Sequence, residues 1–314
     1  IYRPFSKMMM YSDRSMNERV YQMPRLFPFD GAENVAICVT GSGSSKDFSA
    51  LAMALLPDLE VISKSQCFPL YLYLYDKVEE TQHSGSLFAS AAEPSEGEVI
   101  NGYRRRHAIT DAMLAIFRAA YGDAVGKEDI FYYVYGILHS TEYRTRFAAD
   151  LKKMLPRIPL TKDAKDFWAF SKAGRELAHW HLNYETVEPW PVQEQKDTFI
   201  EDAQFYTVQK MAFGRRAKEI DKTTIIYNSH ITLSGIPLAA YDYVVNGKPA
   251  LEWIMERYAV TVDKDSGIRN DPNDWCREHN QPRYIVDLLK RIVRVSMETN
   301  RIVAGLPALN ERKG

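Results

Sequence analysis

Apolar and polar residues alternate in several short stretches of the chain, the pattern typical of β-strands that cover a core on one side. Residues 34–40 show it most clearly, and residues 68–75 alternate tyrosine and leucine with the same period. The pattern also predicts strands within residues 204–212 and 223–233. Residues 1–30 mix aromatic, basic and polar side chains, and predict a β-hairpin followed by an extended crossing.

Helical spacing of apolar residues dominates elsewhere. Residues 130–138, 143–154 and 166–182 each place apolar side chains on one face, and residues 250–258 and 284–303 do so nearer the C-terminus. Together these elements predict an α+β fold with a mixed or antiparallel sheet, several packed helices, a long loop and a helical C-terminus.

The long loop is residues 79–102, which are rich in serine, glutamate, alanine and glycine. Such a segment buries little apolar surface, so we expect it to be solvated and highly mobile.

Composition is ordinary for a globular protein with a sizeable core: 314 residues, 46% hydrophobic and 26% charged. The length fits one large domain or two modest ones, with a possible division near residue 190. No apolar run approaches the ~18 residues of a membrane-spanning helix, and no signal peptide is visible. Cys38, Cys67 and Cys276 are far apart in the sequence and match neither a zinc nor a disulfide framework. We therefore expect a cytoplasmic protein with no membrane partner.

The net charge of −1 does not by itself indicate a nucleic-acid-binding protein, but the charge is unevenly distributed along the chain. Residues 283–314 contain seven Lys or Arg against three acids, whereas residues 79–98 contain five glutamates and no base. Such a distribution is compatible with a protein that contacts phosphates on one face only.

Residues 41–46, Gly-Ser-Gly-Ser-Ser-Lys, suggest a phosphate cradle but lack the spacing of a P-loop. They predict either a flexible turn between strands or a loop that approaches a DNA backbone closely, with Lys46 at its end.

Arg104, Arg105 and Arg106 form the densest positive cluster, at the edge of the acidic loop. They either contact phosphate or balance the neighbouring glutamates, and the sequence leaves both interpretations open.

Catalytic motifs are missing from the sequence. His179 and His181 are two residues apart on a predicted helix, so they point in different directions and do not predict a shared metal. No Asn-Pro-Pro-Tyr tetrapeptide of an adenine methyltransferase occurs. We expect no catalytic residue and no metal site in this chain.

Several segments together resemble the C-terminal specificity domain of single-chain Type ISP restriction–modification enzymes. The opening Tyr-Arg-Pro-Phe is similar to the segment that follows the catalytic core of many adenine-N6 methyltransferases. The most specific segment is residues 129–140, Asp-Ile-Phe-Tyr-Tyr-Val-Tyr-Gly-Ile-Leu-His-Ser. The others are residues 11–14, 21–27, 66–73, 142–144, 155–159, 243–247, 250–253 and 270–275.

The resemblance implies that residues 1–30 are the C-terminal hairpin and linker of a methyltransferase domain, and residues 31–314 a DNA target-recognition domain. The chain starts at Ile1 rather than at a methionine, so we expect a longer polypeptide with a nuclease, an ATP-driven translocase and an adenine-N6 methyltransferase. S-adenosylmethionine, ATP and Mg would belong to those domains, and no cofactor to this one. The expected partners are double-stranded DNA and the methyltransferase and translocase domains.

Specific readout needs side chains with several donors or acceptors, held on loops by a stiff body. The residues of this kind in or beside predicted loops, and our candidates for DNA contact, are Arg14, Asn17, Arg19, Ser42, Ser44, Lys46, Lys64, Gln66, Arg104, Arg105 and Arg106.

Two alternatives stay open. A module that docks the other domains without reading bases would bind DNA weakly and independently of salt. A self-sufficient methyltransferase, disfavoured by the missing motifs, would bind S-adenosylmethionine.

Overall fold

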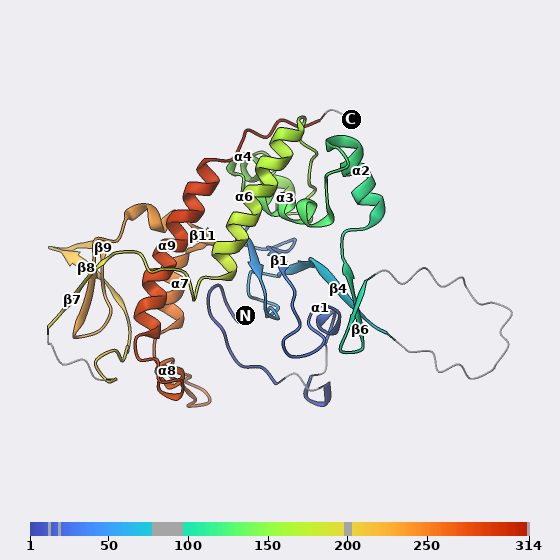
Figure 1. The fold of residues 1–314 in the computed structure, drawn as a ribbon. Helices are drawn as coiled ribbons and strands as arrows, with labels where there is room; N and C mark the ends of the chain where they lie inside the picture. The colour runs from blue at the N-terminus through green and yellow to red at the C-terminus, as the bar shows by residue number, and fades with distance from the viewer. Residues whose placement is uncertain (12–13, 18–19, 77–96, 198–202, 313–314) are drawn as a thin grey trace.

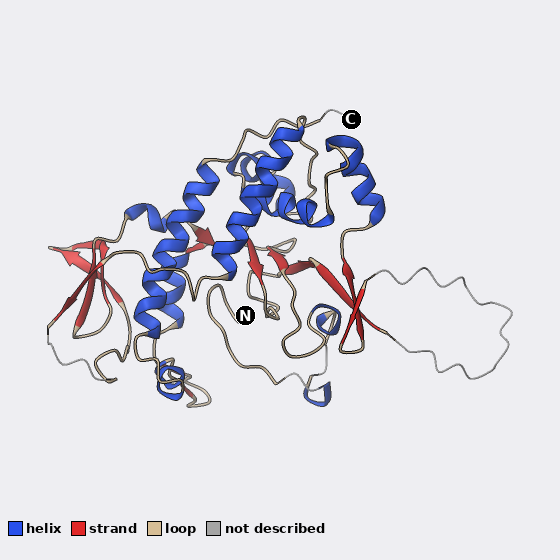
Figure 2. Ribbon diagram, viewed as in Figure 1, coloured by secondary structure: helices blue, strands red, loops and turns tan. Residues whose placement is uncertain are grey.

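The structure, a computed structural model, describes residues 1–11, 14–17, 20–76, 97–197 and 203–312 (Figure 1). Within them the chain has the α+β fold that the sequence predicts, with small antiparallel sheets and packed helices (Figure 2). The helices are α1 (Met23–Leu26), α2 (Asp111–Tyr121), α3 (Lys127–His139), α4 (Thr141–Arg146), α5 (Ala148–Leu151), α6 (Ala164–Leu182), α7 (Ala250–Arg257), α8 (Asn273–Glu278) and α9 (Tyr284–Ala304), with short 3-10 helices η1 (Arg14–Met16) and η2 (Leu238–Tyr241).

The strands are β1 (Ala36–Val39), β2 (Ala50–Met53), β3 (Gln66–Pro69), β4 (Tyr71–Tyr75), β5 (Glu98–Ile100), β6 (Tyr103–His107), β7 (Gln193–Lys196), β8 (Ala212–Arg216), β9 (Glu219–Ile226), β10 (Ile231–Ser234), β11 (Val244–Val245), β12 (Lys248–Pro249), β13 (Thr261–Val262) and β14 (Arg269–Asn270). Their orders are β2-β1-β3, β4-β6-β5 and β7-β10-β9-β8, with the pairs β11-β12 and β13-β14.

The first core lies where α3 and α6 cover the β1 sheet and α2 packs against both helices. Helices α3 and α6 cross very closely because each has a glycine at the crossing. A Cβ on Gly136 would lie 2.2 Å from the Phe170 carbonyl oxygen, and one on Gly174 only 1.8 Å from the Tyr132 carbonyl oxygen. The two helices therefore pack backbone against backbone.

The second core lies under the four-stranded β7–β10 sheet, which α9 and α7 cover. Helix α9 buries one apolar face and lies beside α6, so this helix pair joins the two cores (Figure 1). Among the described residues, no helix combines the length and apolar character that crossing a membrane requires.

A buried polar network lies between α3, α6 and α9. The Nδ1 atom of His181 is 2.5 Å from the Tyr135 hydroxyl, and its Nε2 atom is 2.9 Å from Oγ1 of Thr299. Burial, helped by the nearby Arg144, lowers the pKa of His181 to about 3. Burial also holds the pKa of His139, whose ring lies beside it, well below its usual range. Both imidazoles are therefore neutral at physiological pH.

Most of the predicted elements are confirmed. Residues 34–40 contain β1, residues 68–75 contain the end of β3 and all of β4, and the helices α3, α6, α7 and α9 lie where helical spacing places them. Ser140 caps α4, since its hydroxyl accepts a hydrogen bond from the Tyr143 amide at 3.2 Å.

The hairpin expected in residues 1–30 is wrong for the described part of that segment. The Tyr2 amide donates to the Ser6 carbonyl at 2.9 Å in a tight turn, and Phe5 adopts a φ of 57°. The turn inserts the Phe5 ring into the second core, against Tyr184. The helical turn α1 then begins at Met23, and Pro24 lies in this first turn, where a helix tolerates proline.

Residues 204–212 are irregular up to the start of β8, so the strand predicted there is also wrong. The Asn273 side chain bonds the amide and carbonyl of Val208, at 2.9 and 2.8 Å, in place of a neighbouring strand. Residues 223–233 are interrupted by a turn in which the Asn228 Oδ1 atom accepts a bond from the Ile231 amide at 2.8 Å. Helix α2, which the sequence analysis missed, begins at the cap Thr110.

Cys38 and Cys67, distant in the sequence, are direct neighbours on β1 and β3. Their sulfur atoms are 2.8 Å apart and both are free thiols. Sequence spacing alone misses this proximity, because strand pairing brings the two residues together.

Candidate nucleic-acid interface

Three loops that are distant in the sequence meet beside the β1 sheet: residues 41–46, residues 63–65 and the turn at residues 246–247. We call them the loop cluster. The Ser63 amide donates to Oδ1 of Asn246 at 3.0 Å, which ties the second loop to the third. The Asn246 amide in turn donates to the Ser49 hydroxyl at 2.8 Å.

The first loop is pinned to the second by close backbone approach. A Cβ on Gly41 would lie 2.0 Å from the Lys64 carbonyl oxygen, so only glycine fits there. The Gly41 amide donates to the Ser63 carbonyl at 3.1 Å, and the Lys64 ammonium donates to the Gly43 carbonyl at 2.8 Å. These contacts favour a loop of fixed shape over the flexible turn that the sequence left open.

Four of the sequence-predicted residues, Ser42, Ser44, Lys46 and Lys64, come together in this cluster. Ser42 and Lys46 are exposed, whereas the Ser44 hydroxyl is half-buried and accepts a bond from the Lys46 amide at 2.9 Å. Lys64 is exposed but uses its ammonium to hold Gly43. The structure thus presents the hydroxyl of Ser42 and the ammonium of Lys46 outward.

The cluster is positively charged. The Lys46 side chain lies against Gly247, next to Lys248. Partial burial lowers the pKa of Lys248, and the neighbouring charges of Arg257 and Lys46 lower it further. Lys248 and Arg257 share the Glu256 carboxylate, so the exposed Lys46 ammonium is the cation at this turn that is placed to meet a phosphate.

Gln66 lies at the start of β3, an edge strand of the β1 sheet. Its side chain is exposed, and Phe68, two residues further on the same face, is 44% exposed. An amide is therefore presented beside an aromatic ring, directly after the second loop of the cluster.

Arg104, Arg105 and Arg106 lie in the middle strand β6, not at the loop edge that the sequence predicts. Arg104 bonds the Asp76 carboxylate at 2.8 and 3.0 Å. Arg105 forms an ion pair with Glu98 at 2.9 Å. Alternation along the strand places these two side chains on opposite faces.

The exposed cation of the three is Arg106, for which no ion-pair partner exists among the described residues. Part of the predicted loop 79–102 is also corrected, because Glu98–Ile100 forms β5. The mobility predicted for the loop concerns mainly residues 79–96, which lie outside the described residues. Contact of the arginines with phosphate stays a prediction.

The N-terminal candidates are scattered. Arg14 begins η1, and Asn17 donates through its side-chain amide to the Tyr11 carbonyl at 2.9 Å. Arg19 lies outside the described residues. Contact of these N-terminal residues with DNA stays a prediction.

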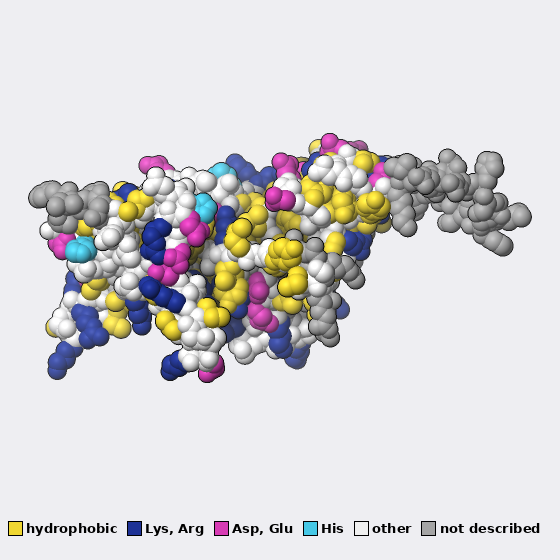
Figure 3. All heavy atoms as spheres, turned by 90° about the horizontal axis from the view of Figure 1, so that it is seen from below, with side chains coloured by type: hydrophobic (Ala, Val, Ile, Leu, Met, Phe, Trp, Pro, Cys, Tyr) yellow, Lys and Arg dark blue, Asp and Glu magenta, His cyan; other side chains and the backbone are white. Residues whose placement is uncertain are grey.

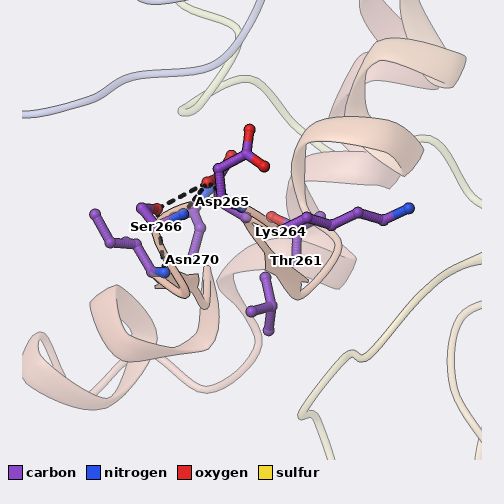
Figure 4. Close-up of a pocket in the computed structure, with 8 residues that line it drawn as sticks. Thr261, Lys264, Asp265, Ser266 and Asn270 are labelled. Carbon is purple, nitrogen blue, oxygen red and sulfur yellow. Dashed lines mark hydrogen bonds between the residues drawn. The ribbon is translucent and has the colours of Figure 1, made fainter.

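A surface hollow of about 640 Å³ lies at the β13–β14 hairpin (Figure 4). All the residues that line it are exposed. The Asp263 carboxylate accepts bonds from the Ser266 amide and hydroxyl, both at 2.8 Å. That carboxylate therefore closes a turn, and the hollow carries no assigned role.

Within the described ranges, no group of three His, Cys, Asp or Glu side chains is placed to hold a metal ion. His181 belongs to the buried network, and His179 is exposed and bonded to Asn183, so the two histidines point apart as the sequence predicts.

One basic feature was missed. Arg215, Arg216 and Lys218 lie at the tip of the β8–β9 hairpin. The run Arg-Arg-Ala-Lys between Phe213 and Ile220 is the sequence signal for this feature.

Comparison with known proteins identifies the class. A family model described as the Type ISP C-terminal specificity domain matches residues 1–288. The chain belongs to this family. A search of curated protein sequences finds no match.

Three solved structures of longer proteins resemble the chain. A nuclease-deletion mutant of the Type ISP restriction–modification enzyme LlaGI, in complex with a DNA substrate mimic, is 35% identical in sequence, with a TM-score of 0.78. The match covers 100% of this chain and 25% of the LlaGI chain. The ATP-dependent Type ISP restriction–modification enzyme LlaBIII bound to DNA is 34% identical, with a TM-score of 0.82, and the match covers 99% of this chain and 18% of the LlaBIII chain. The protein in a DrdV–DNA complex is 34% identical, with a TM-score of 0.79, and the match covers 100% of this chain and 28% of that chain. The chain thus spans between 18% and 28% of the length of these proteins.

Proposed function

We propose that this chain recognises a short asymmetric site in double-stranded DNA, as the specificity domain of a restriction–modification enzyme that methylates adenine at N6. The observation that carries the proposal is the loop cluster. It presents Ser42 and Lys46 from loops whose backbones are fixed by Gly41, Lys64 and Asn246.

The exposed groups suit a duplex. A lysine ammonium pairs with guanine acceptors or with phosphate, a serine hydroxyl accepts or donates, and the Gln66 amide can bond adenine at two atoms. Fixed loops lose little conformational entropy on binding, so such contacts discriminate between bases efficiently.

The relatives support this proposal, because the LlaGI, LlaBIII and DrdV structures are complexes with DNA or a DNA mimic. In a polypeptide of that kind, nuclease, translocase and methyltransferase domains would bind ATP, Mg and S-adenosylmethionine. Residues 1–30 would connect the methyltransferase to this domain. The target adenine would be flipped out of the stack toward the methyltransferase, while this domain grips the flanking duplex.

The test is selection from a pool of duplexes with a randomised segment, using the chain as the binding protein. We expect enrichment of one asymmetric sequence, and tighter binding to it than to random duplex. A pool that stays random after repeated rounds contradicts the proposal.

Single variants then test the loop cluster. Lys46→Ala should weaken binding to the selected duplex by ~1–3 kcal/mol if its ammonium contacts a base, and relax the preference at one position. The control is Lys172→Ala, which removes an exposed lysine from α6 and should change neither quantity.

A second candidate function is docking to neighbouring domains without base reading. It is favoured by a run of exposed apolar side chains, in which Met8, Met9 and Tyr11 are 57%, 98% and 70% exposed. Figure 3 shows hydrophobic side chains gathered in the middle of one face. Weak DNA binding that is insensitive to salt would support this alternative.

A further inference from the structure

The hairpin formed by β8 and β9 extends from the second sheet at one end of the molecule (Figure 1). Its tip consists of residues 215–220, all of which are exposed, and the chain reverses at Ala217 with a φ of 55°. The core of the sheet lies further back, where Ile225 and Leu233 are buried. The tip therefore contributes nothing to the core and is free to contact a ligand.

The tip is cationic: Arg215, Arg216 and Lys218 outnumber the one carboxylate within it, Glu219, and the next carboxylate, Asp221, is bonded inside the hairpin. Arg216 bonds Asp221 through Nε at 3.0 Å. Hydrogen bonds from Thr223, with others from Thr224 and Arg216, lower the pKa of Asp221 to about 2. Asp221 is thus fully occupied within the hairpin.

Arg215 and Lys218 differ from Arg216, which bonds Asp221. Both are exposed, and neither has an ion-pair partner within the part of the chain that the structure describes. Figure 3 shows Lys and Arg side chains gathered at the end of the molecule where Figure 1 places this hairpin. Two unpaired cations at the end of a protruding ribbon are placed to meet an anionic surface.

The outward face of the adjoining strands is polar and carries no carboxylate. Gln193 lies opposite Ser234, and Gln195 opposite Thr232, so these four side chains share one face. Bonds among them are long, at 3.4 Å from Ser234 to Gln193 and 3.5 Å from Gln195 to Ser234, so a ligand can easily replace them.

The acidic residue of the same strand points the other way. Glu194 faces inward, where it bonds Arg283 at 2.9 Å and Lys290 at 3.2 Å. The exposed sheet face thus offers amides and hydroxyls without negative charge, with cations at its tip. A two-stranded ribbon of this kind fits against a DNA duplex.

We infer that the β8–β9 hairpin is a second DNA contact, in which Arg215 and Lys218 bind backbone phosphates outside the base pairs that the loop cluster reads. The inference rests on the proposed function. It assigns to this hairpin a sequence-independent grip, because phosphate contacts fix the position of a protein on the duplex without distinguishing bases.

The test compares the chain with the double variant Arg215→Gln/Lys218→Gln on the selected duplex and on a random duplex, over a range of salt concentrations. Both affinities should fall by the same factor. The slope of log K against log salt should decrease by about 1 for each lost phosphate contact. Phosphate ethylation interference should disappear at two positions outside the recognised site.

The matched control is Lys165→Gln/Lys172→Gln, which removes two exposed positive charges from α6 and should change neither affinity nor slope. If the hairpin variant binds both duplexes with unchanged affinity and slope, the inference is wrong, and the hairpin meets an acidic protein surface or nothing. The proposed function survives that result, since it fails only if the unmodified chain selects no sequence.

Discussion

The close crossing of α3 and α6 makes Gly174→Ala a strong perturbation. An ideal Cβ at this position lies 1.8 Å from the Tyr132 carbonyl oxygen, 2.7 Å from its carbon and 2.9 Å from the Gly136 amide nitrogen. All three atoms belong to the backbone, so no side chain can rotate away. To reach an ordinary contact of about 3.5 Å, the helices would have to separate by more than about 1 Å.

The expected loss of stability is the difference between two effects. Alanine favours a helix interior over glycine by about 1 kcal/mol. Overpacking a close-packed core costs about 1–3 kcal/mol, and the upper end applies here because the obstacle is backbone. We therefore expect Gly174→Ala to reduce the free energy of unfolding by about 2 kcal/mol.

Urea unfolding, followed by the fluorescence of Trp168 and Trp180 on α6, measures this value. The control is Gly305→Ala at the end of α9, where φ is −88° and the nearest atoms to an added Cβ are 3.5 and 3.6 Å away. That variant should stay within ~0.5 kcal/mol of the parent. An unchanged or raised midpoint for Gly174→Ala would refute the close crossing.

Three further predictions follow from contacts described above. His181 has a lowered pKa in the folded chain, so the unfolded chain binds the extra proton and stability should fall as pH drops from about 6.5 toward 3. The urea midpoint of His181→Gln should depend less on pH across that window. An equal slope in both proteins would count against this prediction. Arg104→Ala should lower thermal stability, because it breaks the bidentate bond to Asp76. Arg106→Ala should leave thermal stability unchanged and reduce the salt slope of DNA binding by about 1 if Arg106 contacts phosphate. The reverse pattern would exclude both assignments. Asn246→Ala should weaken binding to the selected duplex more than to random duplex, because it unties residues 63–65 from the turn, and equal losses on both duplexes would show that the tie has no bearing on readout.

The helical part of the fold could be predicted because its signals are local. The apolar spacing of α9 and the Ser140 cap are contained within one helix or its ends. The family resemblance was equally accessible, since it depends on short segments read in order. Predictions failed where a distant residue decides the local conformation, as Asn273 does at Val208.

The candidate site was predictable only in part, for the same reason. Ser42, Lys46 and Lys64 could be selected by residue type, but the contact between their loops could not, because Asn246 and strand pairing create it. The loop edge predicted for Arg104 and Arg105 was wrong, because composition does not show that Asp76 and Glu98 pair with them across a sheet.

The bond from the Ser63 amide to Asn246 joins residues 183 positions apart in the chain. Transplanting residues 41–46 or 63–65 alone into a homologous enzyme would therefore leave the grafted loop without its anchor. If the loop cluster reads bases as proposed, an exchange of sequence preference between two such enzymes would have to carry both the early loops and the turn at residues 246–247. Recombination within this domain is thus constrained to inherit two remote segments together.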